Sequence, residues 1–134
     1  MATVRCDRYR RLDDEQRKRR PIPTSLMSLH ALVRHMADVE RNWFCRALEQ
    51  PDLPAIFWTD KARHVDWAPL DGAEWGANLA VWQAEREQSR LMAAAHSLGD
   101  IGVATRSSQR AEFSLRWIYS HMVEECAVTT GTPI

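Results

Sequence analysis

Hydrophobic side chains recur at helical spacing over residues 24–49, where apolar positions three or four residues apart share one face of an α-helix. One stripe contains Leu26, Leu29, Val33, Met36, Trp43 and Ala47, and it is bordered by Leu32, His35 and Val39. Pro21 and Pro23 enforce an extended approach, and Thr24 or Ser25 can cap the helix start. The pattern predicts an amphipathic helix with a histidine at the edge of its buried face.

Two later segments repeat this spacing and predict two more helices. Over residues 74–97 the period is carried by Trp75, Leu79, Trp82, Ser89, Met92 and Ala93. The helix expected over 113–128 has a stripe of Leu115, Ile118, Met122, Glu125 and Thr129, flanked by Trp117 and His121. Ser114 can cap this last helix.

The intervening segments have the composition of loops. Residues 51–73 combine proline, glycine and aspartate with three aromatic anchors, Phe57, Trp58 and Trp67. Residues 101–112 lack a helical period, and we expect a strand at most over 103–106. Residues 1–20 permit a helix but have few apolar side chains to bury. The chain is therefore expected to be a single all-α domain, 1–134, an up-and-down bundle with a shortened first helix.

Charge and cysteine content indicate which partners and which cellular compartment to expect. Lys plus Arg equals Asp plus Glu, 18 against 18, so the net charge favours neither nucleic acid nor a membrane surface as a partner. The basic block of residues 1–20, which ends in four basic side chains at 17–20, is interrupted by acidic residues at 13–15, and we rank nucleic-acid binding last. The cysteines show no C-x-x-C spacing and no apolar run is long enough to span a membrane, so we expect a cytoplasmic protein.

His121 and Glu125 lie four residues apart and therefore on one side of the last helix. With His35 from a neighbouring helix they offer two imidazoles and a carboxylate, a donor set suited to Zn²⁺, Ni²⁺ or Fe²⁺. The same spacing also fits an ordinary surface ion pair. Glu125 is the most informative of the three, because a carboxylate on an apolar stripe must be paired, protonated or bound to a metal.

Other polar residues have simpler interpretations. Glu40 raises the same question as Glu125, and we expect Arg34 or Arg116 to be its ion-pair partner. Three histidines are interpreted as solvent-facing or loop residues: His30, His64 and His96. Two cysteines are interpreted as small buried apolar residues rather than nucleophiles: Cys45 and Cys126.

Two blocks of sequence carry a family resemblance. The first runs from Thr24 to Phe44 and contains Arg34-His35-Met36-Ala37-Asp38-Val39-Glu40, and the second contains Phe113-Ser114-Leu115-Arg116-Trp117, His121-Met122 and Glu124-Glu125. In this order they resemble the actinobacterial branch of the DinB-like superfamily. That branch includes the mini-circle proteins and is similar to the mycothiol-dependent maleylpyruvate isomerases. The resemblance covers residues 12–127.

The resemblance implies a four-helix bundle and a divalent metal, zinc or nickel, held by three side chains. His35 falls on the first family ligand and Glu125 on the second. The third family ligand is a histidine one helical turn later, where this chain has Thr129. We therefore expect weaker metal binding, with His121 as a supporting residue or a substitute ligand.

Both ends of the chain depart from the family pattern. The family continues with Arg-His-Asn-Gly-His-Ala-Asp where this chain reads Val128 to Ile134, and a one-base shift of the reading frame interconverts the two. We expect such a frameshift to have truncated the last helix. The family's first helix survives only as a fragment between Cys6 and Arg20, so we also expect low solubility or pairing into a homodimer.

The implied activity is that of a metal-dependent transferase or isomerase that uses a low-molecular-weight thiol such as mycothiol, with the metal making the thiol nucleophilic. The expected partners are this thiol and its small-molecule substrate, without nucleic acid or membrane. The alternative is a non-catalytic bundle remnant or interaction module that keeps the fold without the metal.

Overall fold

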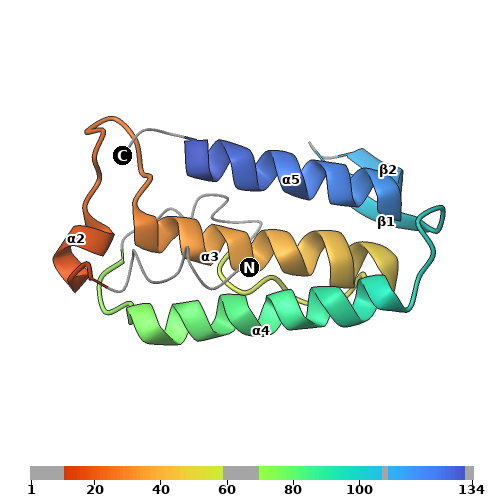
Figure 1. The fold of residues 1–134 in the computed structure, drawn as a ribbon, viewed down its shortest axis with the longest axis horizontal. Helices are drawn as coiled ribbons and strands as arrows, with labels where there is room; N and C mark the ends of the chain where they lie inside the picture. The colour runs from red at the N-terminus through yellow and green to blue at the C-terminus, as the bar shows by residue number, and fades with distance from the viewer. Residues whose placement is uncertain (1–10, 59–69, 107–108, 132–134) are drawn as a thin grey trace.

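Three long helical segments form the body of the computed structural model, which describes residues 11–58, 70–106 and 109–131. They are α3 (Leu29–Glu40) continued by the π-helix η1 (Arg41–Arg46), α4 (Trp75–Ala94) and α5 (Leu115–Gly131). Figure 1 shows α3 between α4 and α5. The mostly helical architecture is as predicted, and each long helix overlaps one of the three segments expected, although α5 continues three residues beyond 128.

Smaller elements lie at the two ends of these helices (Figure 1). The short helix α2 (Asp14–Lys18) lies at one end, and its start is fixed by Asp13, whose side chain accepts a hydrogen bond from the Gln16 backbone N–H at 2.8 Å. At the other end β1 (Ile101–Arg106) and β2 (Gln109–Ser114) form a two-stranded antiparallel sheet. The expected first-helix fragment from Cys6 lies partly outside the described residues.

Helix α3 begins later than the sequence pattern predicts. The Ser28 hydroxyl accepts a hydrogen bond from the Ala31 backbone N–H at 3.1 Å and caps the helix, whereas Ser25 accepts one from Met27 N–H at 3.1 Å in a local turn. Serine hydroxyls that bond nearby backbone compete with helix in this way. Thr24 and Ser25 were therefore the wrong cap, and Leu26, outside the helix, is 44% exposed.

The π-helix η1 changes the phase of the buried face. In this segment the backbone N–H of Ala47 bonds to the carbonyl of Asn42, five residues earlier, instead of four. The wider turn places three consecutive residues in the core, Trp43, Phe44 and Cys45. Apolar periodicity cannot foresee this step, because it assumes a constant 3.6 residues per turn.

The β-hairpin is the main departure from the all-α prediction. It spans 101–114, whereas the sequence suggested a strand at most over 103–106. Gly102 explains its close packing, because a Cβ atom there would lie 2.7 Å from the backbone oxygen of Ala47. The hairpin leads directly into α5, and the Ser114 hydroxyl accepts a hydrogen bond from Trp117 N–H at 3.2 Å, which confirms the predicted cap.

The core lies where α3, η1 and α5 meet the end of α4 and the hairpin. Its buried members are Met36, Val39, Trp43, Phe44, Ala47, Ala93, Ala104, Leu115, Ile118 and Met122. The apolar part of the stripe predicted for the last helix is therefore confirmed. Burying each of the larger side chains contributes about 1.5–3 kcal/mol to stability.

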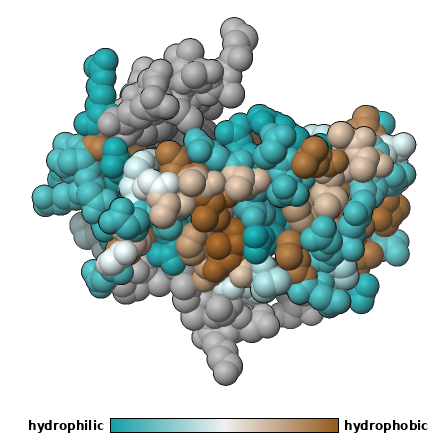
Figure 2. All heavy atoms as spheres, turned by 90° about the horizontal axis from the view of Figure 1, so that it is seen from below, coloured by the Kyte–Doolittle hydropathy of each residue, from teal (hydrophilic) through white to brown (hydrophobic). Residues whose placement is uncertain are grey.

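The surface is mostly polar on the face seen in Figure 2, where hydrophobic atoms gather in a central strip. Within the described parts of the chain, no helix has both the length and the apolar content required to span a membrane.

Candidate metal centre

The structure brings the three predicted ligand residues together. Glu125 on α5 lies between two imidazoles: its Oε1 is 3.2 Å from Nε2 of His121, and its Oε2 is 3.7 Å from Nε2 of His35 on α3. His121 is buried, and the other two side chains are about three-quarters buried, with exposed fractions of 23% for His35 and 26% for Glu125. A carboxylate on the apolar stripe of α5 is thus paired with two imidazoles.

Two imidazoles and a carboxylate are donor types found at zinc and nickel sites in proteins. Metal–nitrogen and metal–oxygen bonds near 2 Å place neighbouring donors of a tetrahedral site about 3.3 Å apart. The two carboxylate–imidazole distances, 3.2 and 3.7 Å, bracket that separation. As placed, the carboxylate of Glu125 lies within 4 Å of both imidazoles, and within the described residues no group of three or more His, Cys, Asp or Glu side chains is arranged to hold a metal ion.

Glu124 approaches the other nitrogen of the same histidine. Its Oε2 lies 3.6 Å from His121 Nδ1, beyond hydrogen-bond distance, and its side chain is 76% exposed. Each ring nitrogen of His121 thus faces a carboxylate, and the nearer and more buried of the two carboxylates is that of Glu125 at Nε2.

Aromatic rings enclose His121. The Trp117 ring stacks on the imidazole with a centroid distance of 4.8 Å and an interplanar angle of 15°, and Trp43 meets it edge-on at 4.8 Å and 70°. Phe113 packs against both tryptophans, at 4.3 Å from Trp117 and 5.1 Å from Trp43. The sequence placed Trp117 and His121 beside each other and Trp43 on a buried stripe, but it did not indicate that Trp43 contacts His121.

A second polar cluster lies between η1 and α4, and the sequence did not reveal it. Arg41 donates two hydrogen bonds to Glu85, from Nη2 to Oε1 at 2.6 Å and from Nε to Oε2 at 3.1 Å. It also donates from Nη1 to the carbonyl of Pro54 at 2.9 Å. Glu85 is buried in the middle of a polar stretch of α4, so its burial leaves no mark on the hydrophobic pattern.

The loop after η1 is fixed to α3 one turn beyond His35. The carboxylate of Asp38 accepts hydrogen bonds from three consecutive backbone N–H groups, those of Ile56 at 2.7 Å and of Phe57 and Trp58 at 2.9 Å. The guanidinium of Arg34 lies 4.6 Å over the Phe57 ring. Phe57 is thus an anchor, as predicted, while Trp67 lies outside the described residues.

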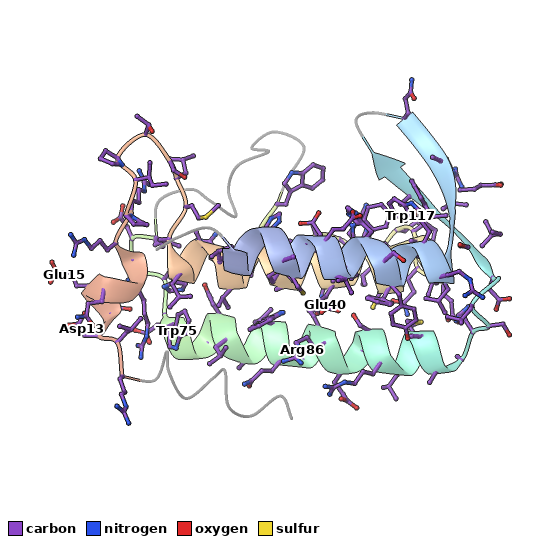
Figure 3. All side chains as sticks on the ribbon, turned by 45° about the horizontal axis from the view of Figure 1, so that its top comes forward. Asp13, Glu15, Glu40, Trp75, Arg86 and Trp117 are labelled. Carbon is purple, nitrogen blue, oxygen red and sulfur yellow. The ribbon has the colours of Figure 1, made fainter. Side chains whose placement is uncertain are left out.

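Glu40 is held apart from the candidate site. Burial raises the pKa of its carboxyl group, while Ser89 and the positive charges of Arg86 and Arg90 on α4 act in the opposite direction. The Ser89 hydroxyl is near enough to favour the carboxylate without a hydrogen bond of ordinary geometry. Figure 3 shows Glu40 and Arg86 on facing helices, so the expected pairing with Arg34 or Arg116 was wrong.

Two of the remaining histidines can be placed. His30 is fully buried, with Nε2 3.0 Å from Oδ1 of Asn78 and its ring edge-on to Trp75, so the prediction of a solvent-facing residue was wrong. Its burial lowers the pKa of the imidazole. His96 is partly buried at the end of α4, with Nε2 3.3 Å from Glu49. His64 lies outside the described residues.

The two cysteines in question differ from each other. Cys45 is buried in η1, as predicted, and burial raises the pKa of its thiol. Cys126 follows Glu125 on α5 and is exposed, so its interpretation as a buried residue was wrong. Successive residues of a helix are rotated by about 100°, so Cys126 lies on a different side of α5 from the candidate ligand Glu125.

Comparison with known proteins gives one match. The model of the family described as mycothiol S-transferase matches residues 5–131, a span that contains all three candidate ligands. No curated protein and no solved structure matches this chain.

Proposed function

Because the chain belongs to the mycothiol S-transferase family, a DinB-like family, we propose that it is a metal-dependent transferase that acts with a low-molecular-weight thiol, here mycothiol. The observation that carries this proposal is the convergence of His35, His121 and Glu125 from two helices. Fold membership alone would not support a reaction, since related folds carry different chemistries.

His35, His121 and Glu125 are the proposed metal ligands. The family pattern places a third ligand one turn after the glutamate, at Thr129, and the described part of α5 continues to Gly131 without a histidine beyond His121. His121 lies one turn before the glutamate, and its Nε2 already lies 3.2 Å from the carboxylate. We therefore propose that it replaces the missing imidazole, with a metal affinity below that of a full family site.

A divalent metal at this position would lower the pKa of a bound thiol, so that the nucleophilic thiolate forms at neutral pH. The residues of this chain do the rest. His35 and His121 remain neutral donors, and Glu125 supplies a negative charge that balances the cation. The aromatic side chains of Trp117 and Trp43 limit the access of water to the His121 ring. In such a drier environment the attraction between charges is stronger.

Metal content tests the proposal. We expect protein purified without a polyhistidine tag to contain zinc or nickel at close to one ion per chain, and His35→Ala to lose it. His96→Ala is the matched control, because this histidine is also partly buried and paired with a glutamate but lies at the far end of α4. Wild-type protein without bound metal after incubation with either ion would contradict the proposal and favour the non-catalytic alternative.

A further inference from the structure

Two aromatic rings contact the imidazole of His121: Trp117, one turn earlier on α5, and Trp43 on η1. Phe113, Trp117, His121 and Glu125 follow one another at intervals of four residues, from the end of β2 along α5. Figure 3 labels Trp117 near the hairpin end of α5. Trp117 stacks on His121 at 4.8 Å and 15°, so the aromatic residues of this row, Phe113 and Trp117, adjoin its polar residues, His121 and Glu125.

A histidine ring needs such a support in order to present one nitrogen in a fixed direction. Rotation about the bond between Cβ and the ring is broad, because this torsion has no narrow staggered minima. At His121 a flat indole lies parallel to the ring, and Trp43 meets the same ring edge-on at 4.8 Å. Turning the imidazole out of its plane would bring its edge against one of these two rings.

We infer that Trp117 is a positioning residue for His121: its stacked ring sets the plane of the imidazole and so directs Nε2 at the position where Glu125 and His35 converge. This inference rests on the proposed function, because it takes His121 as a metal ligand. Trp43 meets the same imidazole edge-on but lies in the core, at 6% exposure, and is less suited to substitution. Trp117 is only partly buried.

The test is a double-mutant cycle in which Co²⁺ affinity of the full chain is measured by competition with a chromophoric chelator. Trp117→Leu removes the flat ring and keeps an apolar side chain, and Trp117→Phe keeps a flat ring. We expect Trp117→Leu to weaken binding about tenfold or more and Trp117→Phe to remain within about threefold of wild type, as for other residues that orient a metal ligand.

The decisive comparison is made in the His121→Ala background. If Trp117 acts through His121, Trp117→Leu has no further effect once the imidazole is absent. Equal weakening in both backgrounds would overturn the inference, because Trp117 would then act only through general packing. Trp82→Leu is the matched control, since Trp82 also packs partly buried against the core but lies on α4, and it should leave Co²⁺ affinity unchanged.

Three further outcomes separate the inference from the proposed function. If Trp117→Leu does not fold, as judged by circular dichroism, Trp117→Ile, which also lacks a flat ring, replaces it in the two backgrounds, with weakening expected only while His121 is present. If the Co²⁺ affinity of His121→Ala equals that of wild type, the inference is overturned, while a site made by His35 and Glu125 remains. Wild-type protein that binds no Co²⁺ overturns the proposed function and the inference with it.

Discussion

Nε2 of His121 lies 3.2 Å from Oε1 of Glu125, one helical turn further along α5. This contact explains how α5 carries a carboxylate on the stripe that otherwise packs Leu115, Ile118 and Met122 into the core. A carboxylate that is about three-quarters buried requires a partner, and here the partner is an imidazole. The same pair of residues thus satisfies the fold and supplies two of the three proposed ligands.

The buried ion pair between η1 and α4 should be costly to break. Glu85→Ala leaves the guanidinium of Arg41 without its two hydrogen bonds to the carboxylate, and we expect the free energy of unfolding to fall by about 2–4 kcal/mol. Urea unfolding followed by circular dichroism measures this change. The exposed pair of Glu87 and Arg90, 3.1 Å apart on the same helix, provides the control, because Glu87→Ala should change stability by no more than about 0.5 kcal/mol. Equal losses in the two variants would contradict the assignment.

Glu40 should make stability depend on pH. Burial raises the pKa of this carboxyl group in the folded state above its ordinary value of 4.5, so the folded protein holds the proton more tightly than the unfolded chain does. The carboxyl group therefore lowers the free energy of unfolding as pH rises from 4.5 through the raised pKa of the folded state. The full loss is present at neutral pH. We expect Glu40→Gln to raise the urea midpoint at pH 7, and the difference from wild type to vanish below about pH 4.5. A Glu40→Gln effect that is the same at pH 4 and pH 7 would rule out this origin.

His30 should make the free energy of unfolding decrease at acidic pH. Burial lowers the pKa of this imidazole in the folded state, so the unfolded chain binds the proton more readily. Stability attributable to His30 is present above its ordinary pKa of 6.5 and declines as pH falls below that value. Replacing His30 with glutamine, which keeps a hydrogen-bonding side chain near Asn78, should flatten the decline between pH 6.5 and pH 5. His96→Gln, at the other end of α4, serves as the control, and an equal flattening by both variants would refute the assignment.

The close contact between the hairpin and η1 gives a steric prediction. A methyl group at Gly102 would meet the backbone oxygen of Ala47 at 2.7 Å, and backbone cannot move aside as a flexible side chain can. We expect Gly102→Ala to lower the free energy of unfolding by about 1–3 kcal/mol. Gly76→Ala, on α4 with no atom within 4 Å of the new methyl group, should be neutral or stabilising by up to about 1 kcal/mol. Thermal unfolding of the two variants compares them directly.

The sequence predicts the three long helices well because each has an apolar stripe over several turns. The sequence pattern is a poorer guide where a single residue outweighs it. The Ser28 cap shortens α3. The close approach permitted by Gly102 favours a hairpin although its second strand contains the charged residues Arg110 and Glu112. The change of phase in η1 is also invisible to periodicity. Local hydrogen bonds and backbone contacts therefore account for the differences.

The candidate site was predictable in part. Spacing placed His121 beside Glu125, a bundle with neighbouring helices allowed His35 to join them, and the family resemblance supported the choice of His35. The aromatic support from Trp43 depends on the phase of η1 and could not be inferred. The effect of Thr129 on metal affinity stays a prediction, because its side chain lies outside the described part of α5.

The most direct test of the central claim is the near-ultraviolet spectrum of the Co²⁺-loaded protein titrated with mycothiol. A thiolate that binds Co²⁺ produces a sulfur-to-metal charge-transfer band, so we expect this band to grow to saturation at one thiol per metal. His35→Ala and Glu125→Gln should abolish it, and His96→Ala should retain it. Saturating Co²⁺ binding by wild-type protein with no charge-transfer band on addition of mycothiol would contradict the account.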